Sequence, residues 1–264
     1  MTDAPRLIFD AHLDMAWNAL EFNRDLLKPV SELREFESQF EGIISGECTV
    51  SWEELRRGRI GMTISTLLPR LNRKDAAMTH YQSRDAAYAS AHGQLAYYRA
   101  LTDQGVLRKI TDAASLRDHV AAWENDPTGD LPIGFILSME GSPPILSPAQ
   151  IPEWYEAGLQ ILGPAHYGPA PYCFGTGSEG GLTAEGPQLL KEMEQVGMLL
   201  DVTHLADQSF WEALDAFSGS VLASHHNCRT LVPGDRQLAD EQIKALIERD
   251  AVIGAAFDCW MIKP

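Results

Sequence analysis

Four short apolar segments of this chain each end at a residue that can bind a metal ion. His12 and Asp14 follow the first segment, and Glu140, His204 and His225 follow the others. An apolar segment of this kind is typical of a buried parallel strand, and the carboxyl ends of parallel strands meet at one rim of a barrel. The sequence therefore predicts an α/β barrel with these five side chains at a common mouth.

Predicted strands alternate with predicted helices along the chain. The strands are expected near 6–10, 60–67, 132–139, 159–164, 198–203, 220–224 and 251–257. The helices are expected over about 75–104 and 31–40, and in the segments that begin near 115, 184, 207 and 239. Such alternation favours a parallel sheet of βαβ units. At 264 residues the chain has the length of one barrel of about 250 residues, so residues 1–264 are predicted to form a single domain.

Two long segments fit no regular element. Residues 18–52 are either a functional loop at the catalytic rim or a variable surface connection, and both interpretations stay open. Residues 163–183 are dense in Gly and Pro and contain His166, which favours a functional loop.

Composition excludes several classes of partner. A formal net charge of −16 leaves no basic patch for nucleic acid and disfavours anionic membranes. No segment has the roughly 18 uninterrupted apolar residues that a membrane span requires. The N-terminus has no signal-peptide pattern, and the cysteines are scattered, which indicates free thiols in a cytoplasmic protein. These are Cys48, Cys173, Cys228 and Cys259.

The residue types at the strand ends suit a transition-metal site. Side chains two apart on an extended chain point the same way, so His12 and Asp14 can chelate one ion. Glu140 can bridge two metal ions, or alternatively pair with an arginine or a helix N-terminus. Imidazoles at His204 and His225 favour Zn²⁺ or a similar metal over Mg²⁺ or Ca²⁺.

The other histidines are not expected to be ligands. His80, His92 and His119 lie in helical patterns, which indicates packing or surface roles. His226 follows His225 directly, so its side chain should point to the opposite side of an extended strand.

Several motifs together resemble one family of enzymes. HLD, MEGS, AHYG, the run GGLTAEGPQLLKEMEQVGMLLDVTHLAD and the run ASHHNCRTLVPGDRQLADEQI are similar in order and spacing to the membrane dipeptidase (renal dipeptidase, peptidase M19) family. The resemblance covers nearly the whole chain and implies a (β/α)₈ TIM-type barrel of the metal-dependent hydrolase group. It also implies a cofactor of two Zn²⁺ ions, with His12 and Asp14 on the first, His204 and His225 on the second, and Glu140 bridging them.

The same resemblance implies the roles of two further residues. His166 would bind the substrate and stabilise the scissile carbonyl, acting with Glu140 in catalysis, and Arg236 would grip the terminal carboxylate of a dipeptide. The implied function is a metallodipeptidase in which a hydroxide shared by the two metals attacks the peptide bond. An amidohydrolase for N-acyl amino acids or lactones is the alternative with the same site.

The C-terminus departs from the family pattern. The family has a further Asp at the end of an eighth strand, whereas this sequence stops at Pro264, shortly after the seventh predicted strand. We therefore expect that the last β/α portion is missing, or that a partner chain closes an open barrel as a homodimer. A non-catalytic metal-binding remnant is the third interpretation.

Overall fold

The computed structural model describes residues 7–41, 46–71, 80–126 and 128–263. These residues form two compact units, and each is described by itself. The first unit comprises residues 1–67 and 92–137, and the second comprises residues 68–91 and 138–264. Helix α4 (Arg84–Asp103) and strand β4 (Ile133–Glu140) cross the border between the two units.

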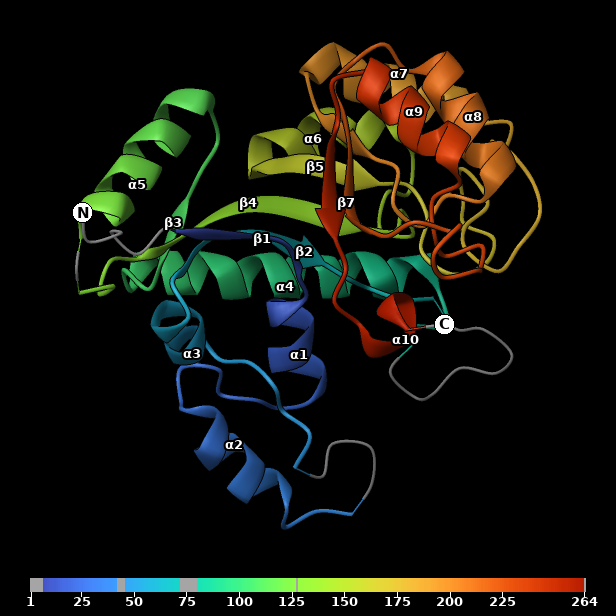
Figure 1. Ribbon diagram of the computed structural model, residues 1–264. Helices are drawn as coiled ribbons and strands as arrows, with labels where there is room; N and C mark the ends of the chain where they lie inside the picture. The colour runs from blue at the N-terminus through green and yellow to red at the C-terminus, as the bar shows by residue number, and fades with distance from the viewer. Residues whose placement is uncertain (1–6, 42–45, 72–79, 127, 264) are drawn as a thin grey trace. The chain divides into compact units, whose positions relative to one another are not determined.

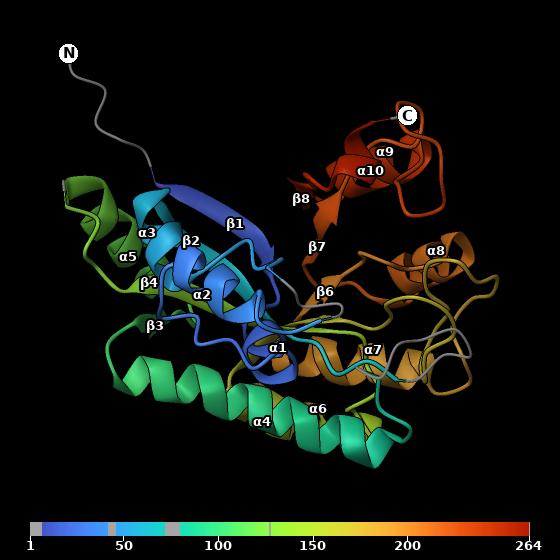
Figure 2. The same ribbon diagram turned by 90° about the horizontal axis from the view of Figure 1, so that it is seen from below.

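The first unit contains the first three helices and a parallel sheet. Its elements besides α4 and β4 are β1 (Ile8–Leu13), α1 (Met15–Glu21), α2 (Val30–Glu37), α3 (Trp52–Arg57), β2 (Ile60–Leu67), β3 (Leu107–Lys109) and α5 (Ala113–Asn125). The strand order is β1-β2-β4, with β3 paired to β4. Helices α1, α3 and α5 contact β2 (Figure 2).

Helix α5 packs closely on the sheet because two strand positions have no side chain. A Cβ on Gly61 would lie 2.5 Å from a ring atom of Trp123, and one on Gly134 would lie 2.5 Å from Nε2 of His119. The His119 ring also hydrogen-bonds the carbonyl oxygen of Gly61 at 2.7 Å. The helix begins at a capping box, in which Asp112 accepts the backbone N–H of Ser115 at 2.7 Å. Of the packing and surface roles predicted for His119, the structure shows the packing role.

The second unit continues the alternation of strands and helices. Its elements are α6 (Ile151–Ala157) with a short 3₁₀ turn before it (Pro148–Gln150), β5 (Leu159–Gly163), α7 (Gly186–Val196), β6 (Leu199–Asp201), α8 (Asp207–Ala216), β7 (Val221–His226), α9 (Asp240–Glu248), β8 (Val252–Ala255) and α10 (Cys259–Ile262). Strands β5, β6, β7 and β8 pair in parallel in this order. Helix α7 contacts both α6 and α8 (Figure 1).

The observed elements agree with the sequence in most places. Each of the seven predicted strands has a counterpart, and the predicted short helix near 31–40 is α2. The helix predicted to start at 75 begins at Arg84 instead, so His80 lies before it, in a bend. Residue 6 and residues 75–79 of those predictions lie outside the described residues. The four cysteines are free thiols, as predicted.

Candidate metal centre

Three imidazole rings of the second unit converge on one carboxylate oxygen. Oε1 of Glu140 lies 3.1 Å from Nε2 of His204, 3.4 Å from Nε2 of His225 and 3.9 Å from Nε2 of His166. Glu140 is only 7% exposed. Glu140, His166 and His204 together have the geometry of a group that could hold a metal ion.

The strands explain why these side chains meet. Glu140 is the last residue of β4, and His225 lies at the end of β7. His204 follows β6 in a turn and adopts a φ of 68°, a left-handed conformation that histidine tolerates better than most residues. The carboxyl ends of parallel strands thus deliver three of the predicted residues to one place.

The fourth member of the group comes from the loop after β5. The His166 ring packs against the His204 ring with centroids 4.4 Å apart, and the partly exposed Tyr167 ring lies 4.9 Å from the same His204 ring. The His204 and His225 rings are 5.3 Å apart. The segment 163–183 therefore contributes His166 to this group, the residue for which a functional loop was favoured.

The donor set fits a divalent transition metal. Burial lowers the pKa of His204 well below its ordinary value, because the charged imidazolium would lose its hydration. At neutral pH this ring is therefore in the neutral form that binds metals. Nitrogen donors beside a carboxylate suit Zn²⁺ and related ions, whereas Mg²⁺ and Ca²⁺ prefer oxygen ligands only.

Three buried residues that the sequence analysis did not identify lie behind the imidazoles. Oγ1 of Thr176 is 3.1 Å from Nδ1 of His204, and Oγ of Ser224 is 2.8 Å from Nδ1 of His225. Asp201 accepts the backbone N–H of Ser224 at 3.1 Å. Each hydroxyl contacts the ring nitrogen that faces away from Glu140, so both rings are held from behind.

Arg236 is a buried cation in the same unit. It is 4% exposed, and its Nη2 donates to the backbone carbonyl oxygen of His225 at 3.0 Å. Burial lowers its pKa, and the nearby Tyr167 and Glu140 oppose this shift. An arginine remains charged despite such a shift, so a positive charge lies beside the backbone of a candidate ligand.

His12 and Asp14 belong to the first unit, where they lie together. Nε2 of His12 is 3.5 Å from Oδ1 of Asp14, and the Thr66 hydroxyl donates to the same oxygen. The backbone N–H of His12 donates to Asp10 at 3.0 Å. The two side chains can therefore chelate one ion, and the prediction that they join the group around Glu140 stays a prediction.

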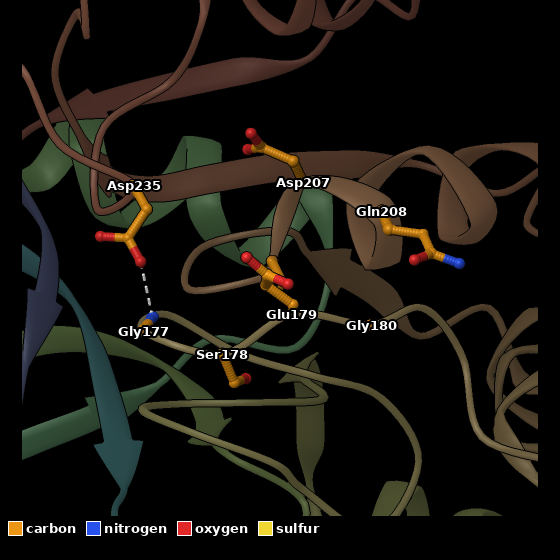
Figure 3. A pocket seen from close by; sticks show the side chains of 8 residues that line it. Gly177, Ser178, Glu179, Gly180, Asp207, Gln208 and Asp235 are labelled. Carbon is orange, nitrogen blue, oxygen red and sulfur yellow. Dashed lines mark hydrogen bonds between the residues drawn. The ribbon is translucent and has the colours of Figure 1, made fainter.

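The loop that carries His166 is tied to the segment that carries Arg236. The carboxylate of Asp235 accepts the backbone N–H of Gly177 at 2.7 Å (Figure 3). These residues line a pocket of about 690 Å³ together with Ser178, Glu179, Gly180, Ala206, Asp207 and Gln208. The tie lies one residue from Thr176 and one residue from Arg236, so it holds the backbone next to both of these residues.

His226 takes no part in either candidate group. It is buried, and neither ring nitrogen has a hydrogen-bond partner among the described residues. Burial lowers its pKa well below the ordinary value.

The helices of the described part of the chain were also compared with the length and hydropathy of a membrane span, and none of them meets both requirements.

Comparisons with known proteins give one consistent result. The family model for membrane dipeptidases, peptidase family M19, matches residues 4–263. An uncharacterized Acinetobacter calcoaceticus protein from the PQQ-III 3′ region is 29% identical over 140 residues, which is 50% of this chain and 44% of that relative. The match thus spans less than half of that relative's length.

Two solved structures share the fold. The dipeptidase AC, a metallopeptidase of family M19, is 18% identical with a TM-score of 0.79, covering 98% of this chain and 74% of that chain. A Rhodobacter sphaeroides metallopeptidase with a phosphinate mimic of L-Ala-D-Ala is 19% identical with a TM-score of 0.76, covering 98% and 76%. These likenesses confirm the predicted α/β barrel fold of the TIM type.

Proposed function

Because the chain belongs to the membrane dipeptidase family, peptidase family M19, we propose that it is a metal-dependent hydrolase that cleaves dipeptides. The observation that carries the proposal is the convergence of the His204 and His225 imidazoles on one oxygen of Glu140, at 3.1 and 3.4 Å. Glu140 is a buried acid beside a neutral imidazole, His204, and a bound cation would compensate for the burial of its charge.

We assign two zinc ions to this function. His204 and His225 would hold one ion, His12 and Asp14 would hold the other, and Glu140 would bridge them. The nitrogen donors support zinc over the hard divalent ions. When bound, such metal ions polarise a carbonyl oxygen and lower the pKa of a bound water to about 7.

The protein's own side chains would position the substrate. His166 lies at the edge of the group, 3.9 Å from Glu140, where its Nε2–H can donate to the scissile carbonyl oxygen as negative charge develops there. Arg236 would bind the terminal carboxylate through two parallel hydrogen bonds, since its planar guanidinium matches that geometry. Together they fix a short substrate at both its reactive bond and its charged end.

The test combines metal content with turnover. The purified protein should contain zinc and hydrolyse members of a dipeptide panel, and dialysis against a chelator should abolish activity until zinc is restored. His204→Ala should lose most of the activity, because one ligand is gone. His92→Gln, on helix α4 and outside the group, is the matched control and should retain it.

Two outcomes would contradict the proposal. Hydrolysis that persists after chelation and in His204→Ala would show that the metal group is not the active site. Hydrolysis of lactones or N-acyl amino acids, without hydrolysis of any dipeptide, would support the proposed metal site but contradict dipeptides as its substrates.

A further inference from the structure

A buried hydroxyl lies behind each of the two imidazoles that face Glu140. Oγ1 of Thr176 is 3.1 Å from Nδ1 of His204, and Oγ of Ser224 is 2.8 Å from Nδ1 of His225. Metal-binding histidines usually donate the other ring N–H to a carboxylate, a backbone carbonyl or a water. Here the hydroxyl groups of a serine and a threonine occupy that position.

The contacts of Thr176 bear on which ring nitrogen of His204 carries the proton. Its hydroxyl donates to the backbone carbonyl oxygen of His204 at 3.3 Å, and its own N–H donates to the same oxygen at 2.7 Å. A hydroxyl that donates its single proton to a carbonyl can only accept at the ring. In the arrangement in which the hydroxyl donates to this carbonyl, Nδ1 of His204 carries the ring proton, and Nε2 presents a lone pair toward Glu140.

Ser224 can hold His225 in the same form. Its hydroxyl lies 3.2 Å from the hydroxyl of Thr203, to which it can donate while it accepts the Nδ1 proton of His225. Asp201 then fixes both hydroxyl residues, because its Oδ1 accepts the N–H of Thr203 at 3.0 Å and that of Ser224 at 3.1 Å. The backbone on both sides of this contact is thus anchored to one carboxylate.

Burial strengthens these hydrogen bonds, and few other groups could replace a hydroxyl that is removed. Thr176, Thr203, Ser224 and Asp201 are all buried, so water does not compete for their hydrogen bonds. A buried ring N–H left without an acceptor is destabilised, because it has lost its hydrogen bonds to water and gained none in their place. Removing a hydroxyl would therefore favour the other tautomer, in which Nε2 carries the proton and cannot bind a metal.

We infer that Thr176 and Ser224 are positioning residues that hold His204 and His225 with Nδ1 protonated, so that both Nε2 lone pairs face Glu140 and are available to a divalent cation. The inference rests on the proposed function for the identity of the site. It concerns only the affinity for the metal, which can be measured without any substrate.

The experiment measures metal affinity and ligand-field spectra. Zn²⁺ affinity is obtained by competition with a chromophoric chelator, and the visible spectrum of the Co²⁺-substituted protein reports the coordination. Thr176→Val should weaken Zn²⁺ binding about 10–100-fold and change the Co²⁺ spectrum, which is the usual loss for such outer partners. Thr176→Ser, which keeps the hydroxyl, should restore both, and Ser224→Ala should resemble Thr176→Val.

A matched control separates this role from packing. Thr183 lies in the same loop, and its hydroxyl donates to the carbonyl oxygen of Pro171 at 2.9 Å, so Thr183→Val makes the same change without touching a ring. Thermal unfolding of the metal-free proteins identifies any variant that fails to fold. Thr183→Val should bind Zn²⁺ as the parent protein does.

The outcomes distinguish this inference from the proposed function. Unchanged affinity in Thr176→Val, or no recovery in Thr176→Ser, would overturn the inference while leaving hydrolysis intact. A parent protein that binds Zn²⁺ with the predicted variant effects but cleaves no dipeptide would overturn only the proposed function. A parent protein that binds no divalent metal would overturn both.

Discussion

Replacing Arg236 by Met should remove the preference for substrates that carry a free carboxylate. The guanidinium is 4% exposed, and its Nη1 has no hydrogen-bond partner among the described residues. Its Nη2 already donates to the carbonyl oxygen of His225 at 3.0 Å, which fixes the orientation of the planar group. A substrate carboxylate would therefore meet a preorganised donor whose side chain loses little further entropy on binding.

The expected loss of kcat/KM in Arg236→Met follows from the number of hydrogen bonds that the guanidinium makes to the substrate carboxylate. A hydrogen bond to a charged group contributes about 1.5–3 kcal/mol, and a carboxylate can accept two from one guanidinium. The loss of both corresponds to about 3–6 kcal/mol, or about 10²–10⁴-fold in kcat/KM. Arg236→Lys keeps the charge without the two parallel donors, so its loss should be intermediate.

The assay compares one dipeptide with its C-terminal amide. The ratio of the two kcat/KM values should be large in the parent protein and close to one in Arg236→Met. Arg229→Met is the matched control, since Arg229 lies in the same segment but pairs with Asp207 through two contacts of 2.7 Å. If Arg236→Met lowers both kcat/KM values equally, or neither, the carboxylate-binding role is refuted.

Two further predictions concern the stability of the first unit. Burial lowers the pKa of His119, so the unfolded chain binds a proton before the folded protein does, and the free energy of unfolding should fall as the pH drops below about 6.5. Urea titrations at several pH values should show a flatter dependence for His119→Gln, and an unchanged slope would exclude this histidine as a cause. Glu37 is 2% exposed and accepts the Nε–H of Arg24 at 2.5 Å, so Glu37→Ala should cost about 3–5 kcal/mol, because the guanidinium of Arg24 would lose its charged partner. The double replacement of Arg24 and Glu37 should cost less than the sum of the single changes, and full additivity would contradict the pairing.

The strands could be predicted because apolar runs of five to eight residues carry a clear signal. The strand that was missed, β3, is three residues long and contains two cations, Arg108 and Lys109. Its pairing with the start of β4 is a tertiary contact that no local pattern indicates. Short strands of this kind are formed by their neighbours and not by their own composition.

Helix boundaries were less well determined than the helices themselves. The Ala-rich pattern predicted a start at 75, but the chain at Tyr81 donates its N–H to the carbonyl oxygen of Arg70 at 2.7 Å instead of entering a helix. The helix predicted to begin near 207 does begin there. Asp207 is the first residue of α8, where its carboxylate pairs with Arg229.

Only part of the candidate site could be predicted from the sequence, namely the histidines and the glutamate at strand ends, where such residues are uncommon without a function. His204, His225 and Glu140 stood out because a polar group directly after a buried run needs an explanation. Thr176 and Ser224 did not, since hydroxyl residues are common in loops and strands alike. Their role depends on how the loop after β5 folds back onto the turn at His204, which is a property of the three-dimensional structure.

The left-handed backbone at His204 restricts how this position could change during evolution or in a designed library. A φ of 68° disfavours β-branched and bulky side chains, whereas Asn, Asp and Gly adopt it at low cost. Asn and Asp also offer an oxygen donor, so they are the replacements most compatible with both the turn and a bound cation. A sequence library at this position should therefore yield folded proteins with oxygen ligands, and such variants could shift metal preference from zinc toward harder ions.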